Sequence, residues 1–384
     1  MKADKPEIVF IFQDLLGGVS SFNFNIINFS TLKSRFHVKV ILVKESSDVR
    51  PVFQDYFEAD EISRFSYSAK ENQHHLQKRL NGFIGNTRGA IVTDYGLAIQ
   101  AARRFNNPKT IFNLIHDFYY VKQQMKLGKL TDVALAHASF FSDAVFAADP
   151  TAFAGRSFYI PYGVQQRDSF PEKDSAALNL VFLGRLEEGK GAHRLVEIQK
   201  RLQETGISVN WTIIGRGSLS STIREQWSSY KVAFFEPETT KQVYELLGKQ
   251  DIFIFPTTFE GTPVSILECL ANGVVSIVND LPGGIRDIVT KGIGFRCKYN
   301  DMDEFVTRIQ ELHFNRPLLK EMQQNCFALA HASYDIRKNA DLYFEMFLQF
   351  EAFRRTEGQT SEKLVKLDRP FIPNWLSKKV RQFR

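Results

Sequence analysis

The sequence predicts an α/β protein built from two successive doubly wound domains that face each other across a cleft. Short, nearly continuous apolar runs recur along the chain and alternate with stretches of helical spacing, which is typical of strands buried in a parallel sheet. The alternation stops at a polar segment, residues 165–177, and then begins again. With 384 residues the chain is long enough for two such domains.

The first half of the chain predicts an N-terminal Rossmann-like domain at residues 1–164. Its first apolar run is interrupted early by Gln13 and Asp14, so we expect a strand there and not a signal peptide. Helices are expected at 71–83 and 95–105. The five predicted strands are residues 7–14, 37–45, 89–94, 110–117 and 143–149.

The second half predicts a C-terminal Rossmann-like domain at residues 178–333, with residues 165–177 as the linker. Apolar residues at helical spacing in 334–353 predict a helix that crosses back to the first domain. A basic tail, residues 354–384, follows. The five predicted strands of this half are residues 178–186, 208–217, 232–237, 251–257 and 274–280.

Composition narrows the function classes. No apolar run approaches the roughly 20 residues that cross a bilayer, so no membrane crossing is expected. The three cysteines are an odd number without CxxC spacing, which indicates neither a disulfide framework nor a zinc site. We therefore expect a cytoplasmic protein whose thiols stay reduced.

The positive charge of the chain is concentrated in the tail. Residues 354–384 hold nine Lys or Arg and three acidic residues, which leaves 40 of each sign elsewhere. A nucleic-acid-binding protein more often carries its charge on a folded face, so no nucleic-acid partner is expected. Apolar and basic residues alternate in 370–384, which suits a segment on an anionic membrane surface. The alternative is a tail packed on the N-terminal domain with its charges in solvent.

In doubly wound sheets ligands bind beyond the carboxyl ends of the strands, so the residues that follow each strand are the candidates. Gly17 and Gly18 follow the first strand and lead into a helix, an arrangement that can present amides to a phosphate. A simple tight turn is the alternative. His116 follows the fourth strand; a lone histidine there is more often a structural hydrogen-bonding group.

Two cations follow the first strand of the second domain. Arg185 comes just after it, and Lys190 stands five residues further on at a helix start flanked by glycines. Two cations beside a helix N-terminus predict a site for a dense anion such as a diphosphate. The alternative is a pair of solvated surface cations.

The stretch FEGTPVSILE, residues 259–268, places two glutamates eight positions apart in an otherwise apolar segment. Glu260 is expected in the loop after a strand, where it can accept hydrogen bonds from sugar hydroxyls. Thr262 is the predicted N-cap and Pro263 the first helical residue. Glu268, two turns into the helix, can bind a vicinal diol such as that of ribose.

These segments resemble one family. FEGTPVSILE is similar to the E-x7-E motif of retaining glycosyltransferases with the GT-B fold, especially family 4. GRLEEGKG resembles the diphosphate-binding segment of that family, IPYGV its entrance to the interdomain linker, IIGRGSL its GxG turn, and PGGIRDIV its glycine pair before a helix. The segments occur in the family's order over residues 7 to about 350.

The resemblance implies a site for a nucleotide diphosphate sugar. The residues implied to take part in catalysis are His116, Arg185, Lys190 and Glu260. Those implied to hold the diphosphate are Gly17, Gly18, Arg185, Lys190, Val264 and Ser265. Those implied to contact the sugar are His116, Glu260, Gly261, Thr262 and Pro263, while Glu268 is implied to bind the ribose.

The expected activity is transfer of the sugar to a glycan or lipid-linked acceptor with retention, the leaving phosphate taking the acceptor's proton. Neither a metal nor another cofactor is expected. Asp301 and Asp303 match a DxD metal motif, but Asp301 as a helix N-cap explains the pattern. Two alternatives remain: a sugar-nucleotide epimerase of the same fold, and an accessory subunit that binds nucleotide sugars without turnover.

Overall fold

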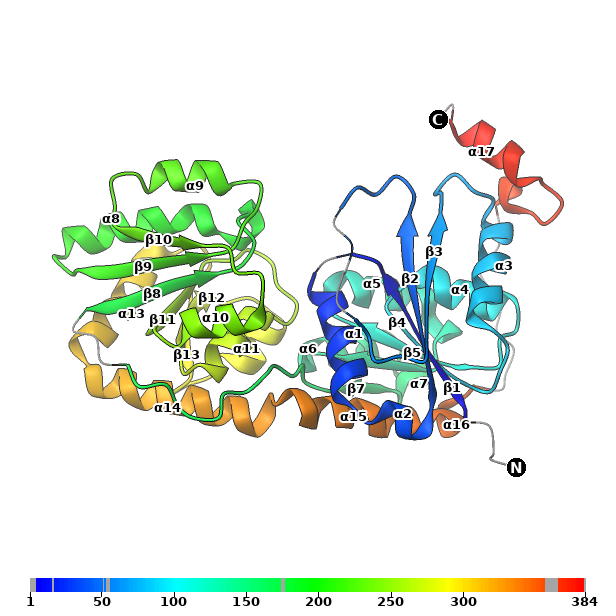
Figure 1. Ribbon diagram of the computed structural model, residues 1–384, viewed down its shortest axis with the longest axis horizontal. Coiled ribbons are helices and arrows are strands. Elements are labelled where there is room, and N and C mark those ends of the chain that lie inside the picture. The colour runs from blue at the N-terminus through cyan, green and yellow to red at the C-terminus, as the bar shows by residue number, and fades with distance from the viewer. Residues whose placement is uncertain are drawn as a thin grey trace. The chain divides into compact units, whose positions relative to one another are not determined.

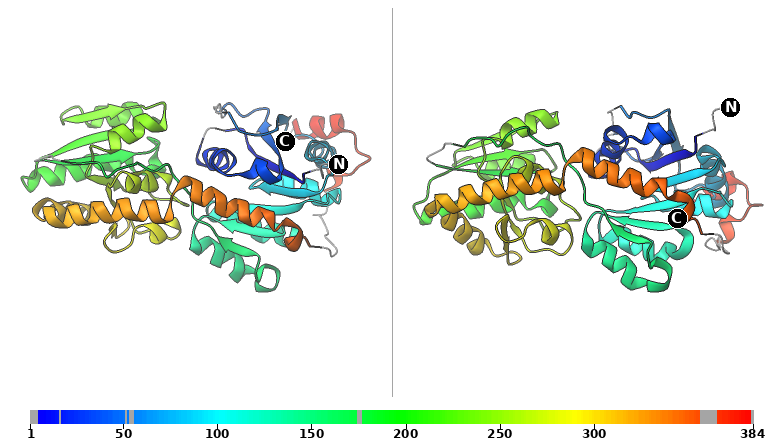
Figure 2. Two further views of the ribbon diagram at one scale, coloured as in Figure 1. Left: turned by 60° about the horizontal axis from the view of Figure 1, so that its bottom comes forward. Right: turned by 90° about the horizontal axis from the view of Figure 1, so that it is seen from below.

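The chain forms two compact units, which Figure 1 shows. The computed structural model describes residues 5–15, 17–50, 52, 56–173, 177–355 and 365–382. Unit 1 comprises Met1–Ile160 together with Arg337–Arg384, and unit 2 comprises Pro161–Ile336. Each unit is a parallel sheet with helices on both faces (Figure 2).

Unit 1 has a seven-stranded parallel sheet of order β3-β2-β1-β4-β5-β6-β7. Its strands are β1 (Glu7–Gln13), β2 (His37–Glu45), β3 (Glu61–Tyr67), β4 (Gly89–Thr93), β5 (Thr110–Ile115), β6 (Val133–Ala136) and β7 (Ser157–Tyr159). Its helices within the first 160 residues are α1 (Gly18–Phe29), α2 (Leu32–Arg35), α3 (Gln73–Ile84), α4 (Gly96–Arg104), α5 (Phe118–Leu127), η1 (Gly128–Leu130), α6 (Ser139–Ala148) and α7 (Pro150–Phe153).

The end of the chain returns to unit 1. It supplies α15 (Ile336–Leu348), α16 (Phe350–Phe353), η4 (Lys366–Asp368) and α17 (Asn374–Gln382). The ring of Phe347 on α15 lies edge-on to Phe10 of β1 and Phe112 of β5. All three rings are buried, and burial of such side chains contributes about 1.5–3 kcal/mol each. Helix α15 is therefore part of the unit 1 core.

Unit 2 has a six-stranded parallel sheet of order β10-β9-β8-β11-β12-β13. Its strands are β8 (Leu178–Leu183), β9 (Val209–Ile214), β10 (Val232–Phe235), β11 (Ile252–Phe255), β12 (Val275–Asn279) and β13 (Gly294–Cys297). Its helices are η2 (Glu188–Lys190), η3 (Ala192–Arg194), α8 (Leu195–Glu204), α9 (Ser220–Gln226), α10 (Thr240–Leu247), α11 (Val264–Ala271), α12 (Gly284–Ile288), α13 (Met302–Phe314) and α14 (Arg316–Ser333).

Each sheet reverses its strand order once, which fixes where a ligand can bind. In unit 1 the reversal lies between β1 and β4, and in unit 2 between β8 and β11. At such a point the loops after two neighbouring strands diverge and leave a crevice at the carboxyl edge. The predicted α/β class with two doubly wound sheets is confirmed.

One predicted strand is wrong. Residues 143–149 belong to helix α6 and its C-terminal end, and among them only Val145 is buried. A strand inside a parallel sheet would bury both faces, whereas α6 buries Phe141, Ser142 and Val145 along one helical face. The strand that pairs with β5 is instead β6, a fully buried run of four residues. Such short apolar runs do not distinguish helix from strand.

Strands β3, β7 and β13 were also missing from the predictions. They lie at or next to the sheet edges, where one face or one side meets solvent, and their burial is partial. The predicted cap of Asp301 is confirmed, because its Oδ1 accepts a hydrogen bond from the Glu304 N–H at 3.1 Å at the start of α13. That contact accounts for the acidic residue without a metal.

The described part of the tail, residues 365–382, packs on the start of α3 (Figure 1). The buried Asn72 amide donates hydrogen bonds to the carbonyls of Leu367, Arg369 and Ile372 at 2.8–3.2 Å. Asp368 accepts from the Gln73 N–H. Of the two predicted alternatives for the tail, packing on the N-terminal unit is the one observed for these residues. Among the described residues no helix has the length and apolarity to cross a bilayer.

Candidate functional site

Three glycines hold the loop that carries Arg185. Gly215 has a φ of 134°, and a Cβ there would come within 2.0 Å of the Gly184 carbonyl oxygen. A Cβ on Gly217 would come within 2.4 Å of the Leu186 carbonyl oxygen. The loops after β8 and β9 therefore stack backbone on backbone, and larger residues would force them apart. Arg185 projects from this stack with a largely exposed side chain and pairs with Glu187 at 2.8 Å.

Lys190 is fixed by a further close backbone approach. Gly191 adopts a left-handed conformation, and a Cβ there would lie 2.1 Å from the carbonyl oxygen of Pro256, just after β11. Lys190 consequently ends a short 3-10 turn, η2, and not the start of an α-helix as predicted. Its Nζ lies 2.7 Å from Glu260 Oε1 and 5.8 Å from the centre of the Phe255 ring. This contact joins the β8 and β11 loops at the reversal of the sheet.

Glu260 is a buried carboxylate with two polar partners. Besides Lys190, the Thr257 hydroxyl lies 3.0 Å from its Oε1. Asn279 donates to the Thr257 carbonyl at 2.8 Å, which fixes the loop. Burial raises the pKa of Glu260, while Lys190, Thr257 and the nearby Arg185 lower it. The direction of the net change is upward, so burial outweighs the cation.

The predicted N-cap of α11 is wrong. The helix begins at Val264, Pro263 is the capping residue, and no side chain caps the helix. Thr262 instead lies against α12: a Cβ on Gly284 would come within 2.8 Å of the Thr262 Cα, and the Gly284 N–H donates to the Gly261 carbonyl at 2.9 Å. Tertiary packing of the loop thus overrides the local capping preference. The first N–H groups of α11, from Val264 and Ser265, have no acceptor within the helix.

Glu268 lies four residues after the start of α11, about one turn and not the predicted two. Burial raises its pKa to about 7. Burial alone shifts the pKa of Glu268, whereas the pKa of Glu260 is also lowered by the neighbouring Lys190.

Gly17 and Gly18 stand at the start of α1, where Gly17 is the N-cap in extended conformation. A Cβ on either residue would meet no atom within 4 Å. Neither packing nor backbone conformation therefore requires glycine at these two positions. Open space in front of the first turn of α1 is what close approach of a ligand needs.

His116 follows β5 in unit 1 and is mostly buried. Its ring packs against Phe22, Tyr120 and His137, at 5.3, 5.0 and 4.5 Å between ring centres. Burial lowers the pKa of His116 to about 3, so the imidazole is neutral at physiological pH. It can exchange hydrogen bonds with a ligand but carries no charge to stabilise a phosphate.

Asp94, directly after β4, was absent from the predicted site. Its side chain is buried, and its Oδ2 lies 3.9 Å from His116 Nε2. The Asp94 pKa is raised to about 6, mainly by burial and to a smaller extent by Asp117, against the lowering effect of a hydrogen bond from Tyr120. Within the described residues neither Asp94 Oδ1 nor His116 Nε2 has a hydrogen-bond partner.

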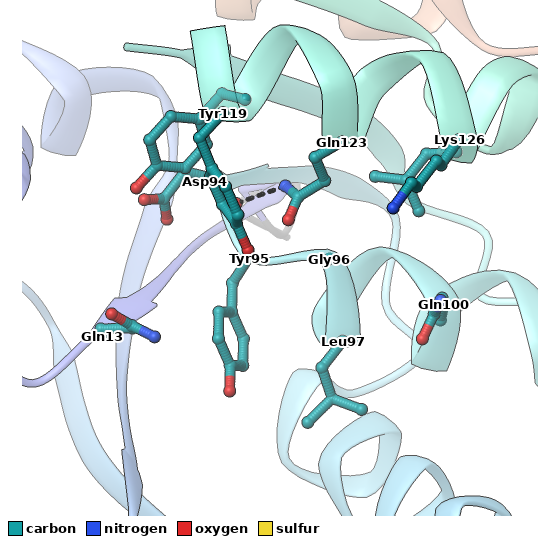
Figure 3. A pocket seen from close by; sticks show the side chains of 11 residues that line it. Gln13, Asp94, Tyr95, Gly96, Leu97, Gln100, Tyr119, Gln123 and Lys126 are labelled. Carbon is teal, nitrogen blue, oxygen red and sulfur yellow. Dashed lines mark hydrogen bonds between the residues drawn. The ribbon is translucent and has the colours of Figure 1, made fainter. Parts of the chain in front are cut away.

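Asp94 lines a pocket of about 420 Å³ at the carboxyl edge of the unit 1 sheet (Figure 3). The pocket opens at the reversal between β1 and β4, since Gln13 ends β1 and Asp94 follows β4. Asp94 is the last residue of the strand predicted at 89–94, so a search beyond the predicted strand ends passed over it; the observed strand ends at Thr93. Thr257 likewise follows a strand and was overlooked.

Comparisons with known proteins agree with this architecture. Residues 165–327 match the family described as glycosyl transferases group 1. The chain is 26% identical over 147 residues to the putative colanic acid biosynthesis glycosyltransferase WcaL of Salmonella typhimurium, a match that covers 35% of this chain and 36% of WcaL. It is 23% identical over 173 residues to an Escherichia coli enzyme, UDP-Gal:alpha-D-GlcNAc-diphosphoundecaprenol alpha-1,3-galactosyltransferase, with 44% of each chain covered. The chain therefore spans less than half the length of either curated relative.

Among solved structures, HepE of Anabaena in complex with UDP superposes with a TM-score of 0.70 at 15% sequence identity. The superposition covers 89% of this chain and 100% of HepE. Together with the two doubly wound sheets, this likeness confirms the GT-B fold. The roles assigned to individual site residues stay predictions.

Proposed function

We propose, from the match of residues 165–327 to the glycosyl transferases group 1 family, that the protein transfers a sugar from a nucleotide diphosphate sugar to a glycan or lipid-linked acceptor. The single observation that carries the proposal is the contact between Lys190 and Glu260 at the reversal of the unit 2 sheet, with Arg185 nearby. The Lys190 ammonium is partly exposed and contacts a buried carboxylate. It can therefore also bind a second anion of higher charge, such as a diphosphate.

Each contact supports one part of the proposed donor site. Lys190 and Arg185 are suited to the diphosphate, and the free N–H groups of α11 add donors for its oxygens. Glu260 is suited to accept a hydrogen bond from a sugar hydroxyl. We propose that Glu268, one turn along α11, accepts hydrogen bonds from a ribose diol, which would favour its ionised form.

The proposed reaction needs charge stabilisation more than a protein base. The acceptor oxygen bonds to the anomeric carbon, the bond from that carbon to the diphosphate breaks, and the acceptor's proton passes to a phosphate oxygen of the leaving group. Lys190 and Arg185 would stabilise the negative charge that develops on that leaving group. We propose that configuration is retained and that no metal is required.

A screen of nucleotide sugars tests the proposal. The purified full chain is incubated with UDP-, GDP- and dTDP-sugars, with and without a lipid extract as acceptor, and the products are followed by mass spectrometry. Binding of each donor is measured in parallel by calorimetry. We expect one donor to bind and its sugar to be transferred with release of the nucleoside diphosphate.

Other outcomes would contradict transfer. Absence of binding to every donor would remove the proposed function. Conversion of the donor into an epimer without acceptor would identify an epimerase, and donor binding without turnover, even with acceptor, would identify an accessory subunit.

We also propose that the exposed side of the packed tail contacts an anionic membrane surface, which suits a lipid-linked acceptor. The relative from Escherichia coli carries a diphosphoundecaprenol-linked substrate in its name. While Asn72 and Asp368 anchor the tail to unit 1, Phe371 and Trp375 remain 72% and 65% exposed beside exposed Lys379. Apolar rings and cations on one anchored segment favour an interface with anionic lipids.

Replacing both rings tests this point without removing the anchored segment. We expect Phe371→Ser with Trp375→Ser to reduce sedimentation with phosphatidylglycerol vesicles several-fold. The control is Phe314→Ser in unit 2, whose side chain is equally exposed. Equal sedimentation of the wild type and the double variant would remove the proposal.

A further inference from the structure

We propose that a pocket at the amino edge of the unit 1 sheet binds a soluble phosphate monoester that carries an apolar body. The pocket has a volume of about 430 Å³, and every residue that lines it belongs to unit 1. It lies at the opposite edge of the sheet from Asp94 and His116, which follow their strands. The inference therefore goes beyond the proposed function and does not rest on it.

The place of the pocket in the fold follows from the residues that come before three strands. Lys5 and Pro6 precede β1, while Phe36 and Arg88 directly precede β2 and β4. The three strands are parallel neighbours, so their amino ends lie at one edge of the sheet. The end of α15 and the start of α16 complete the lining, and Figure 1 shows α2 and α16 at this edge.

The lining carries an excess of positive charge. Its charged side chains are three cations and one carboxylate: Lys5, Arg35, Arg88 and Glu351. Arg88 pairs with Glu351, which leaves two cations without a carboxylate in the lining. Lys5 Nζ donates one hydrogen bond, to the Lys33 carbonyl at 2.6 Å, and an ammonium has three donors. Two uncompensated cations favour a ligand with two negative charges, such as a phosphate monoester at neutral pH.

Arg35 is the cation most available to such a ligand. Its side chain is exposed and forms no hydrogen bond or ion pair within the described residues. A guanidinium can bind two phosphate oxygens at once through parallel N–H groups. The Arg88 guanidinium, in contrast, is held by Glu351 and lies 5.5 Å from the centre of the Phe350 ring. Arg88 therefore shapes the wall of the pocket, and Arg35 is free to contact the phosphate.

The apolar part of the lining favours an organic phosphate over inorganic phosphate. Phe36 and Phe350 are buried with their ring centres 6.0 Å apart, and the partly buried Pro6 and Leu348 complete the apolar lining. A bare phosphate ion would leave this surface in contact with water, whereas an apolar body would cover it. The volume of the pocket also lies within the roughly 300–1,000 Å³ that is usual for small organic ligands.

The position of the pocket favours a soluble phosphate over the headgroup of a lipid. The tail that we propose to contact a membrane packs on the start of α3, which follows β3 and so lies at the carboxyl edge of the sheet. Figure 1 shows α17 at that edge and α16 at the other. With the tail on a membrane, the pocket at the amino edge faces away from the lipid.

Saturation-transfer NMR with phenyl phosphate and the full chain tests the pocket. We expect phenyl phosphate to bind at least tenfold more tightly than phenol, which lacks the charge. It should also bind at least tenfold more tightly than inorganic phosphate, measured as a competitor, which lacks the apolar body. Saturating UDP and the substitution Lys190→Met should leave this binding unchanged, because the proposed donor site is in unit 2.

Two substitutions should change the affinity for phenyl phosphate in opposite directions. Arg35→Gln removes the free guanidinium, and we expect about tenfold weaker binding. Glu351→Gln removes the carboxylate of the lining and releases Arg88 to the phosphate, so we expect several-fold tighter binding. Arg369→Gln is the control, since Arg369 is an exposed arginine of unit 1 outside the pocket, and this variant should bind like the wild type.

Three results would overturn the proposal. They are absence of phenyl phosphate binding, loss of that binding in the presence of UDP or in Lys190→Met, and equal affinity of the wild type and Arg35→Gln. The second result would place the phosphate at the donor site in unit 2.

Sedimentation with phosphatidic acid vesicles distinguishes the two sources of phosphate. We expect the wild type and Arg35→Gln to sediment equally with these vesicles. If Arg35→Gln reduced sedimentation but left the affinity for phenyl phosphate unchanged, the pocket would bind a lipid headgroup, and the proposal of a soluble ligand would be wrong.

Discussion

Glu260 in unit 2 and Asp94 in unit 1 occupy comparable places in the two sheets. Each carboxylate follows the strand on one side of the reversal in strand order, and burial raises the pKa of each. They differ in their partners. Glu260 has the Lys190 ammonium at 2.7 Å and the Thr257 hydroxyl, whereas the described groups that act on Asp94 are the Tyr120 hydroxyl, the Asp117 carboxylate and the neutral His116.

The difference shows how one fold prepares two kinds of site. In unit 2 the cations are already present and partly compensated, which suits a ligand that brings two or more negative charges. In unit 1 the surroundings of the carboxylate contain hydrogen-bonding groups and aromatic rings without a close cation, so the carboxylate lacks this compensation. The strand ends provide the position in both units, and the loop residues decide the chemistry.

Removal of the Lys190 ammonium should have the largest effect. We expect Lys190→Met to lower the rate of sugar transfer on the order of a hundredfold or more, because the developing phosphate charge loses a preorganised cation. It also leaves Glu260 buried without its cation. The measurement is the initial rate of nucleoside diphosphate release with donor and acceptor.

Lys200→Met is the matched control, since Lys200 is exposed on α8 of the same unit. If the initial rate of the Lys190→Met enzyme were within a few-fold of that of the Lys200→Met enzyme, the Lys190 ammonium would not contribute to catalysis. The proposed difference between the two units would then be wrong.

Neutralising Asp94 should stabilise the protein. Its folded pKa of about 6 lies above the ordinary value of 3.8, so the ionised form is disfavoured in the folded state. This difference in pKa corresponds to a destabilisation of the folded state by about 3 kcal/mol. The destabilisation is complete above pH 6 and disappears as the pH falls toward 4. We expect Asp94→Asn to raise the free energy of unfolding by up to that amount at pH 8 and by less at pH 5, measured by urea unfolding.

Asp132→Asn should change stability in the opposite direction. Asp132 is buried in the same unit but is paired with Arg103 and accepts from the N–H groups of Ile111 and Arg355 at 2.7 and 2.9 Å. Breaking a buried pair of this kind costs about 3–5 kcal/mol. If Asp94→Asn destabilised the protein as Asp132→Asn does, Asp94 would be a structural group and not an uncompensated carboxylate.

The smallest effects should come from the two hydroxyl partners. Thr257→Val and Tyr120→Phe each remove one donor from a buried carboxylate, at about 0.5–1.5 kcal/mol or roughly three- to tenfold. Both changes should raise the pKa of the neighbouring carboxylate. Thr257→Val should therefore slow transfer, and Tyr120→Phe should raise the pKa of Asp94, measured by NMR titration of its carboxyl group, without slowing transfer as much. The two variants should not exchange their effects; if Tyr120→Phe altered donor affinity as much as Thr257→Val, the division of roles between the units would be wrong.

The sequence predicted the buried strands well and the short or edge elements poorly. Residues 37–45 form β2 with the predicted bounds, because a long buried run leaves few alternatives. Residues 143–149 were predicted as a strand and form part of α6, because the pattern of an apolar run this short suits either element. Thr262 was predicted as an N-cap from local preference alone, and packing against Gly284 places it elsewhere.

For the site, order along the chain was enough to select Arg185, Lys190 and Glu260, since residues that follow parallel strands gather at one edge. It did not reveal that Lys190 contacts Glu260, nor that Asp94 lies beside His116, because each pair is joined by loops whose paths depend on distant glycines and on sheet pairing. Asp94 showed no motif in the sequence; only its burial and its missing partner mark it.

By itself, the sequence determined the fold class, the two sheets and the strand ends where chemistry is possible, because hydrophobic periodicity and glycine positions act locally. The tertiary structure alone decided which charges are paired and which are left unpaired. Pairing depends on the distance between groups far apart in the chain and on how much water each one loses, and burial changes the pKa of Asp94, His116 and Glu268 by amounts that no local pattern records.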